Sequence, residues 1–190
     1  MSPVVTCAIN RNHEGPRLRH HGHIDHSPLI VTREAVPADF DRYFQEGFDA
    51  LSPESRHMRF FTPVHELPEP VLKRLADVDG TYNGAVIAFD AALRDDDRHP
   101  EGRPVGVARW MGSQTGPAEL SVTVIDEYQG TGVGSRMMDA MLVLARKRGI
   151  RRLIADVLRE NVPMRALINR YRAVVQPSGD PRIVRYRVDI

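Results

Sequence analysis

The sequence has a single cysteine, Cys7, few aromatic residues and almost no net charge. One cysteine cannot form an internal disulfide, so the fold does not depend on an oxidising compartment. The 26 basic and 25 acidic residues nearly cancel, which argues against the overall field of a nucleic-acid-binding or membrane-binding protein. Residues 1–30 also lack an apolar run long enough for a signal peptide or a membrane span. We therefore expect a cytoplasmic protein with no nucleic-acid or membrane partner.

The rest of the composition is typical of one globular domain. At 190 residues and 42% hydrophobic, the chain can bury a sizeable core, and this length favours one domain over two. Residues 1–27 differ, because they hold five of the eight histidines and little apolar material, and we expect a flexible His-rich tail. These histidines show no fixed metal-ligand spacing, so the sequence predicts no metal site. Residues 28–190 are expected to form the single domain.

Hydrophobic periodicity and turn residues predict the elements of this domain. Pro37 and Pro53 are placed to open two helices, with Ser52 capping the second, and Asn161 is placed to cap another. The expected order is one strand, three helices, three antiparallel strands, a helix, a strand, a helix and two strands. The expected strands are 29–35, 84–93, 104–112, 117–125, 151–158, 172–177 and 182–190, and the expected helices are 37–51, 52–61, 67–78, 133–149 and 161–171.

A glycine-rich loop joins the third antiparallel strand to the next helix. Gly130, Gly132 and Gly134 expose backbone N–H groups at a helix N-terminus, where the helix dipole favours an anion. A nucleotide-binding P-loop needs a lysine and then Ser or Thr after its last glycine, but here Ser135 and Arg136 follow. A dinucleotide fingerprint needs G-x-G-x-x-G in the first turn of a parallel sheet, whereas this loop reads G-x-G-x-G after antiparallel strands. Neither alternative fits well.

The segment from Gln129 to Gly134 instead matches the Q/R-x-x-G-x-G/A pattern of the GNAT (Gcn5-related N-acetyltransferase) superfamily. The element order from residue 28 onward resembles the GNAT core, and "LSPESRHMRFF" resembles the GNAT domain of Pat-type bacterial protein lysine acetyltransferases. This resemblance implies an α+β fold, with a mixed sheet of about six to seven strands splayed at its centre and flanked by helices. It also implies acetyl-CoA as the cosubstrate.

The resemblance assigns roles to particular residues. Glu119 stands at the position of the catalytic base in Pat-type proteins, and its place on a period-2 strand puts its side chain opposite that of Leu120. Many GNAT enzymes carry a tyrosine that protonates the leaving thiolate, but the matching position here is Ile168, so no general acid is assigned. The residues expected to bind the cosubstrate are Val122, Thr123, Val124, Gln129, Gly130, Thr131, Gly132, Val133, Gly134, Ser135 and Asn161.

The acceptor is left open at this point. The leading interpretation is an acetyltransferase acting on a protein lysine, with an acyl-CoA synthetase as the acceptor that the resemblance suggests. A small-molecule amine acetyltransferase and a non-catalytic acyl-CoA sensor are the alternatives, because one fold hosts many functions. An acidic, closed acceptor pocket would favour a small polyamine, and an open groove would favour a protein. A monomer and a homodimer are both compatible with the sequence.

Overall fold

The computed structural model describes residues 28–95, 97–112 and 116–190. The expected flexible tail, residues 1–27, lies outside the described residues. Within the described part, the element order is the predicted one: a strand, three helices, three strands, a helix, a strand, a helix and two strands, with two short 3-10 helices added. The α+β class is therefore confirmed.

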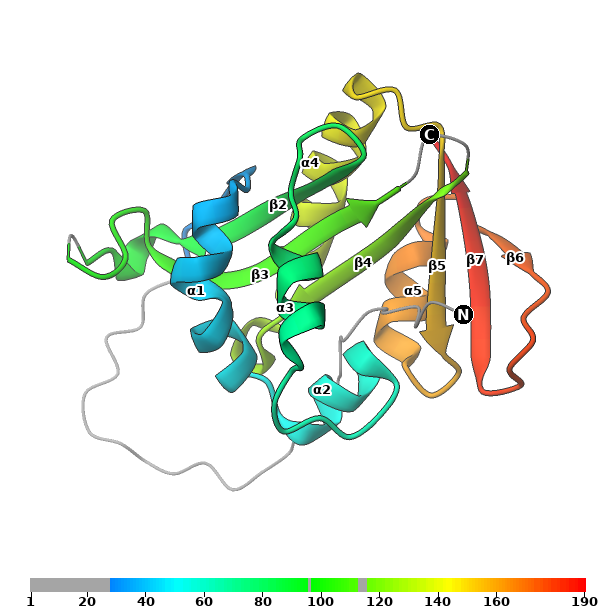
Figure 1. The fold of residues 1–190 in the computed structure, drawn as a ribbon, viewed down its shortest axis with the longest axis horizontal. Coiled ribbons are helices and arrows are strands. Elements are labelled where there is room, and N and C mark those ends of the chain that lie inside the picture. Colours follow the sequence, from blue (N-terminus) through cyan, green and yellow to red (C-terminus); the bar gives the residue numbers. More distant parts are fainter. Residues whose placement is uncertain (1–27, 96, 113–115) are drawn as a thin grey trace.

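Seven strands form one mixed sheet in the order β1-β2-β3-β4-β5-β7-β6 (Figure 1). All neighbouring strands are antiparallel except β4 and β5, which are parallel. The strands are β1 (Ile30–Glu34), β2 (Asn83–Asp90), β3 (Arg103–Met111), β4 (Ala118–Val124), β5 (Arg152–Leu158), β6 (Val174–Gln176) and β7 (Ile183–Asp189).

The sheet opens between its two parallel strands. β4 pairs with β3 from Glu119 to Val124, but it pairs with β5 only through Ala118 with Leu153 and Glu119 with Ile154. Beyond Glu119 the two strands diverge, and the backbone of β5 continues its pairing with β7 alone, as far as Leu158. The splay predicted at the centre of the sheet is confirmed, and Glu119 stands where it begins.

The helices cover the two faces of the sheet unequally (Figure 1). Helices α1 (Pro37–Asp49), α2 (Pro53–Phe60) and α3 (Glu69–Ala76) lie on one face, over the half built from β1 to β4. Helices α4 (Val133–Lys147) and α5 (Val162–Asn169) lie on the other face. On the α1–α3 side, α2 reaches only the ends of β5 and β7, where Met58 packs with Leu158 and Ile183. On this face, no described helix covers the rest of the half-sheet formed by β5, β6 and β7.

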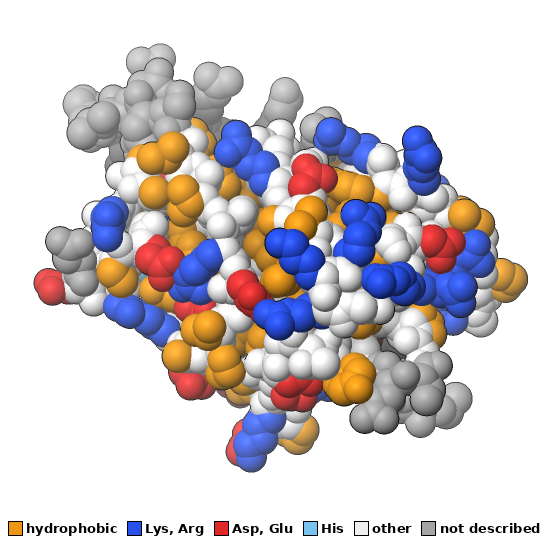
Figure 2. Space-filling view, turned by 90° about the horizontal axis from the view of Figure 1, so that it is seen from above, with side chains coloured by type: hydrophobic (Ala, Val, Ile, Leu, Met, Phe, Trp, Pro, Cys, Tyr) orange, Lys and Arg blue, Asp and Glu red, His pale blue; other side chains and the backbone are white. Residues whose placement is uncertain are grey.

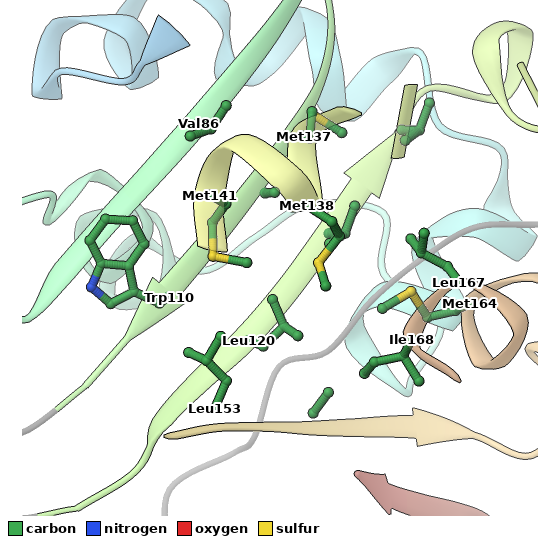
Figure 3. Packing of buried hydrophobic residues seen from close by; sticks show 14 of the residues in the cluster. Val86, Trp110, Leu120, Met137, Met138, Met141, Leu153, Met164, Leu167 and Ile168 are labelled. Carbon is green, nitrogen blue, oxygen red and sulfur yellow. The ribbon is translucent and has the colours of Figure 1, made fainter. Parts of the chain in front are cut away.

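The main core lies between the sheet and the pair α4 and α5 (Figure 3). Met137, Met138 and Met141 of α4 are fully buried against the strands, and Ile168 of α5 closes the core on the other side of the splay. This apolar contact fixes the start of α4, and therefore the glycine loop, relative to β4.

The strand expected at 84–93 ends earlier than predicted, at Asp90. The buried Asp90 carboxylate accepts hydrogen bonds from the N–H groups of Leu29 and Ala92 and from the Tyr128 hydroxyl. It caps the 3-10 helix Ala91–Leu93, which takes the place of the last predicted strand residues. The local Asp turn therefore overrides the apolar pattern.

Candidate active site

The glycine loop takes the backbone conformation that its sequence indicates. Gly130 and Gly132 have φ angles of 76° and 90°, in the left-handed region that L side chains rarely adopt. A Cβ placed on Gly132 would have no atom within 4 Å, so this position faces open space. The loop thus presents bare backbone at the start of α4.

The N–H groups of this loop divide into two sets. Those of Gln129 and Thr131, both predicted to bind the cosubstrate, already donate to Asp126 and Tyr128 carbonyls at 3.2 and 3.4 Å. In the described part of the chain, the N–H groups from Gly132 to Ser135 have no acceptor, as expected in the first turn of a helix. These groups and the helix dipole together suit an anion such as a pyrophosphate.

A cleft of about 560 Å³ lies in front of these N–H groups. One side is formed by Val124 at the end of β4 and by the loop, with Gln129, Gly130, Gly132, Gly134 and Ser135 among the lining residues. The other side is formed by α5, through Pro163, Leu167 and Arg170. The cleft therefore lies between the end of β4 and the helix that follows β5, at the wide end of the splay. The room and the exposed donors fit an elongated, phosphate-bearing cosubstrate.

Five predicted cosubstrate residues lie outside the lining of this cleft. Thr131 is one of them, and its hydroxyl donates to the Tyr128 carbonyl at 2.6 Å. Val122 and Val133 are buried in the core, and the Thr123 hydroxyl faces the α1–α3 side, where it accepts a hydrogen bond from Arg59. The Asn161 side chain is buried and caps α5, accepting from the Met164 N–H at 3.1 Å. The predicted helix cap is confirmed, and this cap positions the α5 wall of the cleft.

Arg170 lines the cleft although the sequence pattern did not single it out, and the next residue, Tyr171, bonds to α4. Arg170 lines the cleft and donates to the Ser135 hydroxyl at 2.9 Å, which brings a cation to the start of α4. The Tyr171 hydroxyl donates to Asp139 at 2.9 Å, and burial together with this hydrogen bond raises the pKa of Tyr171 above its ordinary value. Tyr171 therefore holds its proton firmly and links α5 to α4. The next residue, Arg172, has a φ of 53°, in the left-handed region.

The glycine loop is also tied to the start of α2, in the "LSPES" segment. Asp126 accepts hydrogen bonds from the Ser52 N–H, the Ser52 hydroxyl and the Ser55 hydroxyl, at 3.0, 2.7 and 2.9 Å. The Gln129 side chain donates to the Ser55 hydroxyl and to the Val124 carbonyl. Ser52 caps α2 as predicted. Because Ser52 and Ser55 both donate to Asp126, they also hold the start of α2 against the segment that leads into the glycine loop.

Glu119 lies on the sheet face opposite α4 and α5. Its side chain is 18% exposed, and its Oε2 is 3.8 Å from Nη2 of Arg74. It lines a second cleft, of about 450 Å³, together with Ile154 and Asp156 of β5 and Arg185 of β7. The two clefts therefore approach the opening of the sheet from opposite faces, one along the glycine loop and one at Glu119.

Two buried guanidinium groups stand behind Glu119 on the same face. Arg59 donates to the Thr123 and Ser121 hydroxyls, and Arg109 donates to the Leu75 carbonyl at 2.8 Å. Burial and the charge of Arg59 lower the pKa of Arg109 to about 9, while the charge of Glu119 acts to raise it. Arg109 thus remains protonated at neutral pH. The Glu119 carboxylate lies in a cationic field that attracts it.

The structure gives two further findings on possible partners. Among the described residues, no group of three or more His, Cys, Asp or Glu side chains is placed to hold a metal ion. No described helix is long and apolar enough to cross a membrane.

Comparison with known proteins agrees with this geometry. Residues 41–172 match the model of the acetyltransferase (GNAT) family. The chain belongs to the GNAT family. It is thus an acetyltransferase of a class that takes its acetyl group from acetyl-CoA. The GNAT resemblance of the glycine loop and of the element order is confirmed.

Individual relatives include Pat-type proteins. The chain is 33% identical over 145 residues to an acetyltransferase of Pseudomonas aeruginosa, a match that covers 76% of this chain and 74% of that protein. It is 32% identical over 144 residues to the acetyltransferase Pat of Mycolicibacterium smegmatis, covering 75% of this chain and 40% of that protein. The fold is also that of the crystallised GNAT domain of S. lividans PAT, with a TM-score of 0.71, 24% identity and coverage of 84% and 89% of the two chains.

Proposed function

We propose that this GNAT enzyme transfers the acetyl group of acetyl-CoA to a protein lysine, with Glu119 as the general base. The observation that carries this proposal is the place of Glu119 at the last pair before β4 and β5 separate, in a cleft on the face opposite the glycine loop. A donor bound along the glycine loop and an acceptor entering beside Glu119 would meet at the opening of the sheet. The Pat relative supports a protein as the acceptor.

A base is needed because the amine arrives protonated. With an ordinary lysine pKa of about 10.4, roughly one amine in a thousand is neutral near pH 7.4, and only the neutral form attacks a thioester. Glu119 would take the proton of the attacking nitrogen, directly or through a water molecule. The C–N bond then forms as the C–S bond breaks, and the CoA thiolate leaves with a proton from water. Pairing with Arg74 keeps the carboxylate at the cleft.

On the donor side, we propose that the N–H groups from Gly132 to Ser135 bind the pyrophosphate and that Arg170 adds a positive charge beside it. The predicted residues Gln129 and Thr131 then shape the loop, since their N–H groups are already engaged. Val122 and Val124 would border the pantetheine arm at the splay, and Asn161 would hold its far wall through the α5 cap.

The acceptor cleft favours a protein over a small polyamine. Asp156 is 2% exposed in its side chain and is bonded at 2.6 Å to Arg185, so its charge is compensated. The cleft borders the half of the sheet that no described helix covers along its length, and its described lining residues do not form a closed acidic pocket. A polycation would find little net attraction there, whereas a protein segment would find an open surface.

The test compares wild type with Glu119→Gln, using release of free CoA as the readout and acyl-CoA synthetases and small amines as acceptors. Glu69→Gln is the matched control, because it makes the same change at a side chain that is 75% exposed on α3. Loss of a positioned base is expected to lower acceptor-dependent turnover by about 10²–10⁴-fold. The KM for acetyl-CoA and the turnover of the control are expected to stay near wild type. A Glu119→Gln enzyme within threefold of wild type would exclude Glu119 as the base.

A further inference from the structure

The surface next to Glu119 is a half-sheet that α2 reaches only at the ends of β5 and β7, and no other described helix lies over it. Arg152, Ile154 and Asp156 alternate along β5, and they stand directly opposite Asp189, Arg187 and Arg185 of β7. Directly opposed residues share a face, and Ile154 is also the partner of Glu119. We call this surface the open face, and it consists of Arg152, Ile154, Asp156, Arg185, Arg187 and Asp189.

The open face pairs three guanidinium groups with two carboxylates. Asp156 is buried, and the Nε and Nη2 of Arg185 bond to its two oxygens at 2.6 Å. The Arg185 side chain is 38% exposed, and its remaining nitrogen, Nη1, has no acceptor among the described residues. Arg187 and Arg152 both contact Asp189, at 3.1 and 3.2 Å, so two guanidinium groups share one carboxylate. A partner that reaches this face meets guanidinium groups that still have N–H donors to offer.

Basic residues are also in excess in the C-terminal part of the chain, which forms β5, β6 and β7. Residues 151–190 carry nine Arg but only four Asp and Glu, although the whole chain has a net charge of only +1. In Figure 2, Lys and Arg side chains outnumber Asp and Glu side chains on the side where β5, β6 and β7 lie. The excess therefore lies in the part of the chain that forms β5, α5, β6 and β7, and it does not appear in the overall composition.

We propose that the acceptor lysine lies in an extended segment with acidic side chains beside it, and that Arg185 and Arg187 bind those carboxylates while the amine reaches Glu119. This inference rests on the proposed function, because it names the protein substrate of the same site. Arg185 lines the cleft that contains Glu119, and Arg187 is paired with the neighbour of Glu119 across the sheet. Recognition and chemistry would thus occur on one continuous surface.

The strand geometry defines the spacing of the acidic residues. Arg185 and Arg187 are two residues apart on one face of β7, which corresponds to about 6.6–6.8 Å. Alternate side chains of an extended peptide have the same spacing. The preferred acceptor therefore carries its acids at alternate positions next to the lysine. A nucleic acid would also be attracted to cations, but it presents no alkylamine to the Glu119 cleft.

The first experiment measures kcat/KM of the full-length enzyme for three matched lysine peptides. They differ only at two alternate flanking positions, which carry Glu, Gln or Lys. We expect kcat/KM to be roughly tenfold higher for the Glu peptide than for the Lys peptide. The difference is expected to arise from KM for the peptide, because charges at the rim of a binding site steer and align the partner. The preference is expected to shrink at 1 M salt, where the Debye length is about 3 Å.

Arg187→Glu and the milder Arg187→Gln test the assignment, and Arg146→Glu is the control for the total charge. Arg146 is exposed at the end of α4, on the other side of the sheet. We expect both Arg187 variants to lose most of the preference and the control to keep it. Equal rates on all three peptides in wild type would overturn this inference and leave the proposed function standing. A wild-type enzyme that acetylates no peptide or protein but does acetylate small amines would overturn both.

Discussion

Gly132 and Gly149 provide a matched pair for testing the role of the glycine loop. They flank the two ends of α4, have φ angles of 90° and 87°, and each would place a Cβ with no atom within 4 Å. Only Gly132 faces the cleft along α5. An alanine at either position meets the same backbone conformation, so the two variants separate backbone strain from loss of the binding surface.

The expected loss of stability is similar for Gly132→Ala and Gly149→Ala. A left-handed L residue costs about 1–2 kcal/mol. Alanine also lowers the conformational entropy of the unfolded chain relative to glycine, and this offsets about 0.4–1 kcal/mol of the cost. A net loss of about 1 kcal/mol lowers the Tm by roughly 2–4 °C for a domain of this size. Thermal and urea unfolding of both variants measure this quantity.

The expected effect on cosubstrate binding differs between the two. A methyl group on Gly132 stands where the anion approaches the N–H groups of α4, and one lost charge-assisted hydrogen bond is worth about 1.5–3 kcal/mol. Gly132→Ala is therefore expected to weaken CoA binding about tenfold or more in calorimetry, and Gly149→Ala to leave it unchanged. Equal losses of affinity in both variants, or an unchanged affinity in Gly132→Ala, would refute the assignment of this loop as the pyrophosphate site.

Two further predictions concern carboxylates that organise the fold. Asp126→Ala removes the acceptor of three hydrogen bonds from Ser52 and Ser55, and we expect a loss of about 2–3 kcal/mol in urea unfolding together with a higher KM for acetyl-CoA. Burial acts to raise the pKa of Asp39, but hydrogen bonds from Arg33 and from the Val36 N–H lower it below 3.8. This stabilisation is present above about pH 4 and is lost as the pH falls through the lowered pKa, so stability below pH 4 should fall less steeply in Asp39→Asn than in wild type.

The order of elements could be read from the sequence because its signals are local. Pro53 after Ser52, Asn161 before Pro163 and Gly149 after a basic turn are short-range features, and all three mark helix ends in the structure. The glycine loop is likewise a continuous segment, so its family pattern survives in one stretch of chain.

The contacts that the sequence did not reveal join residues distant in the chain. Asp126 contacts Ser52 across 74 positions, and Arg170 contacts Ser135 across 35. Neither pair follows a helical or strand period, because each depends on how two elements pack. The open face could not be recognised from the sequence either. Its cations alternate with buried apolar residues along the strands, and acidic residues elsewhere in the chain balance their charge.

The splay has a consequence for how the molecule holds together. Across the centre of the sheet, β4 and β5 are joined by two residue pairs alone, whereas β5 and β7 share seven. The sheet is therefore two well-bonded blocks joined along a weak seam, and the α4–α5 contact behind it bridges the blocks. Backbone amides near the seam should open at lower free energy than those inside either block. A cosubstrate lying along the seam would connect the two blocks. Its binding would therefore raise the free energy of local unfolding at the seam more than it would change the shape of the molecule.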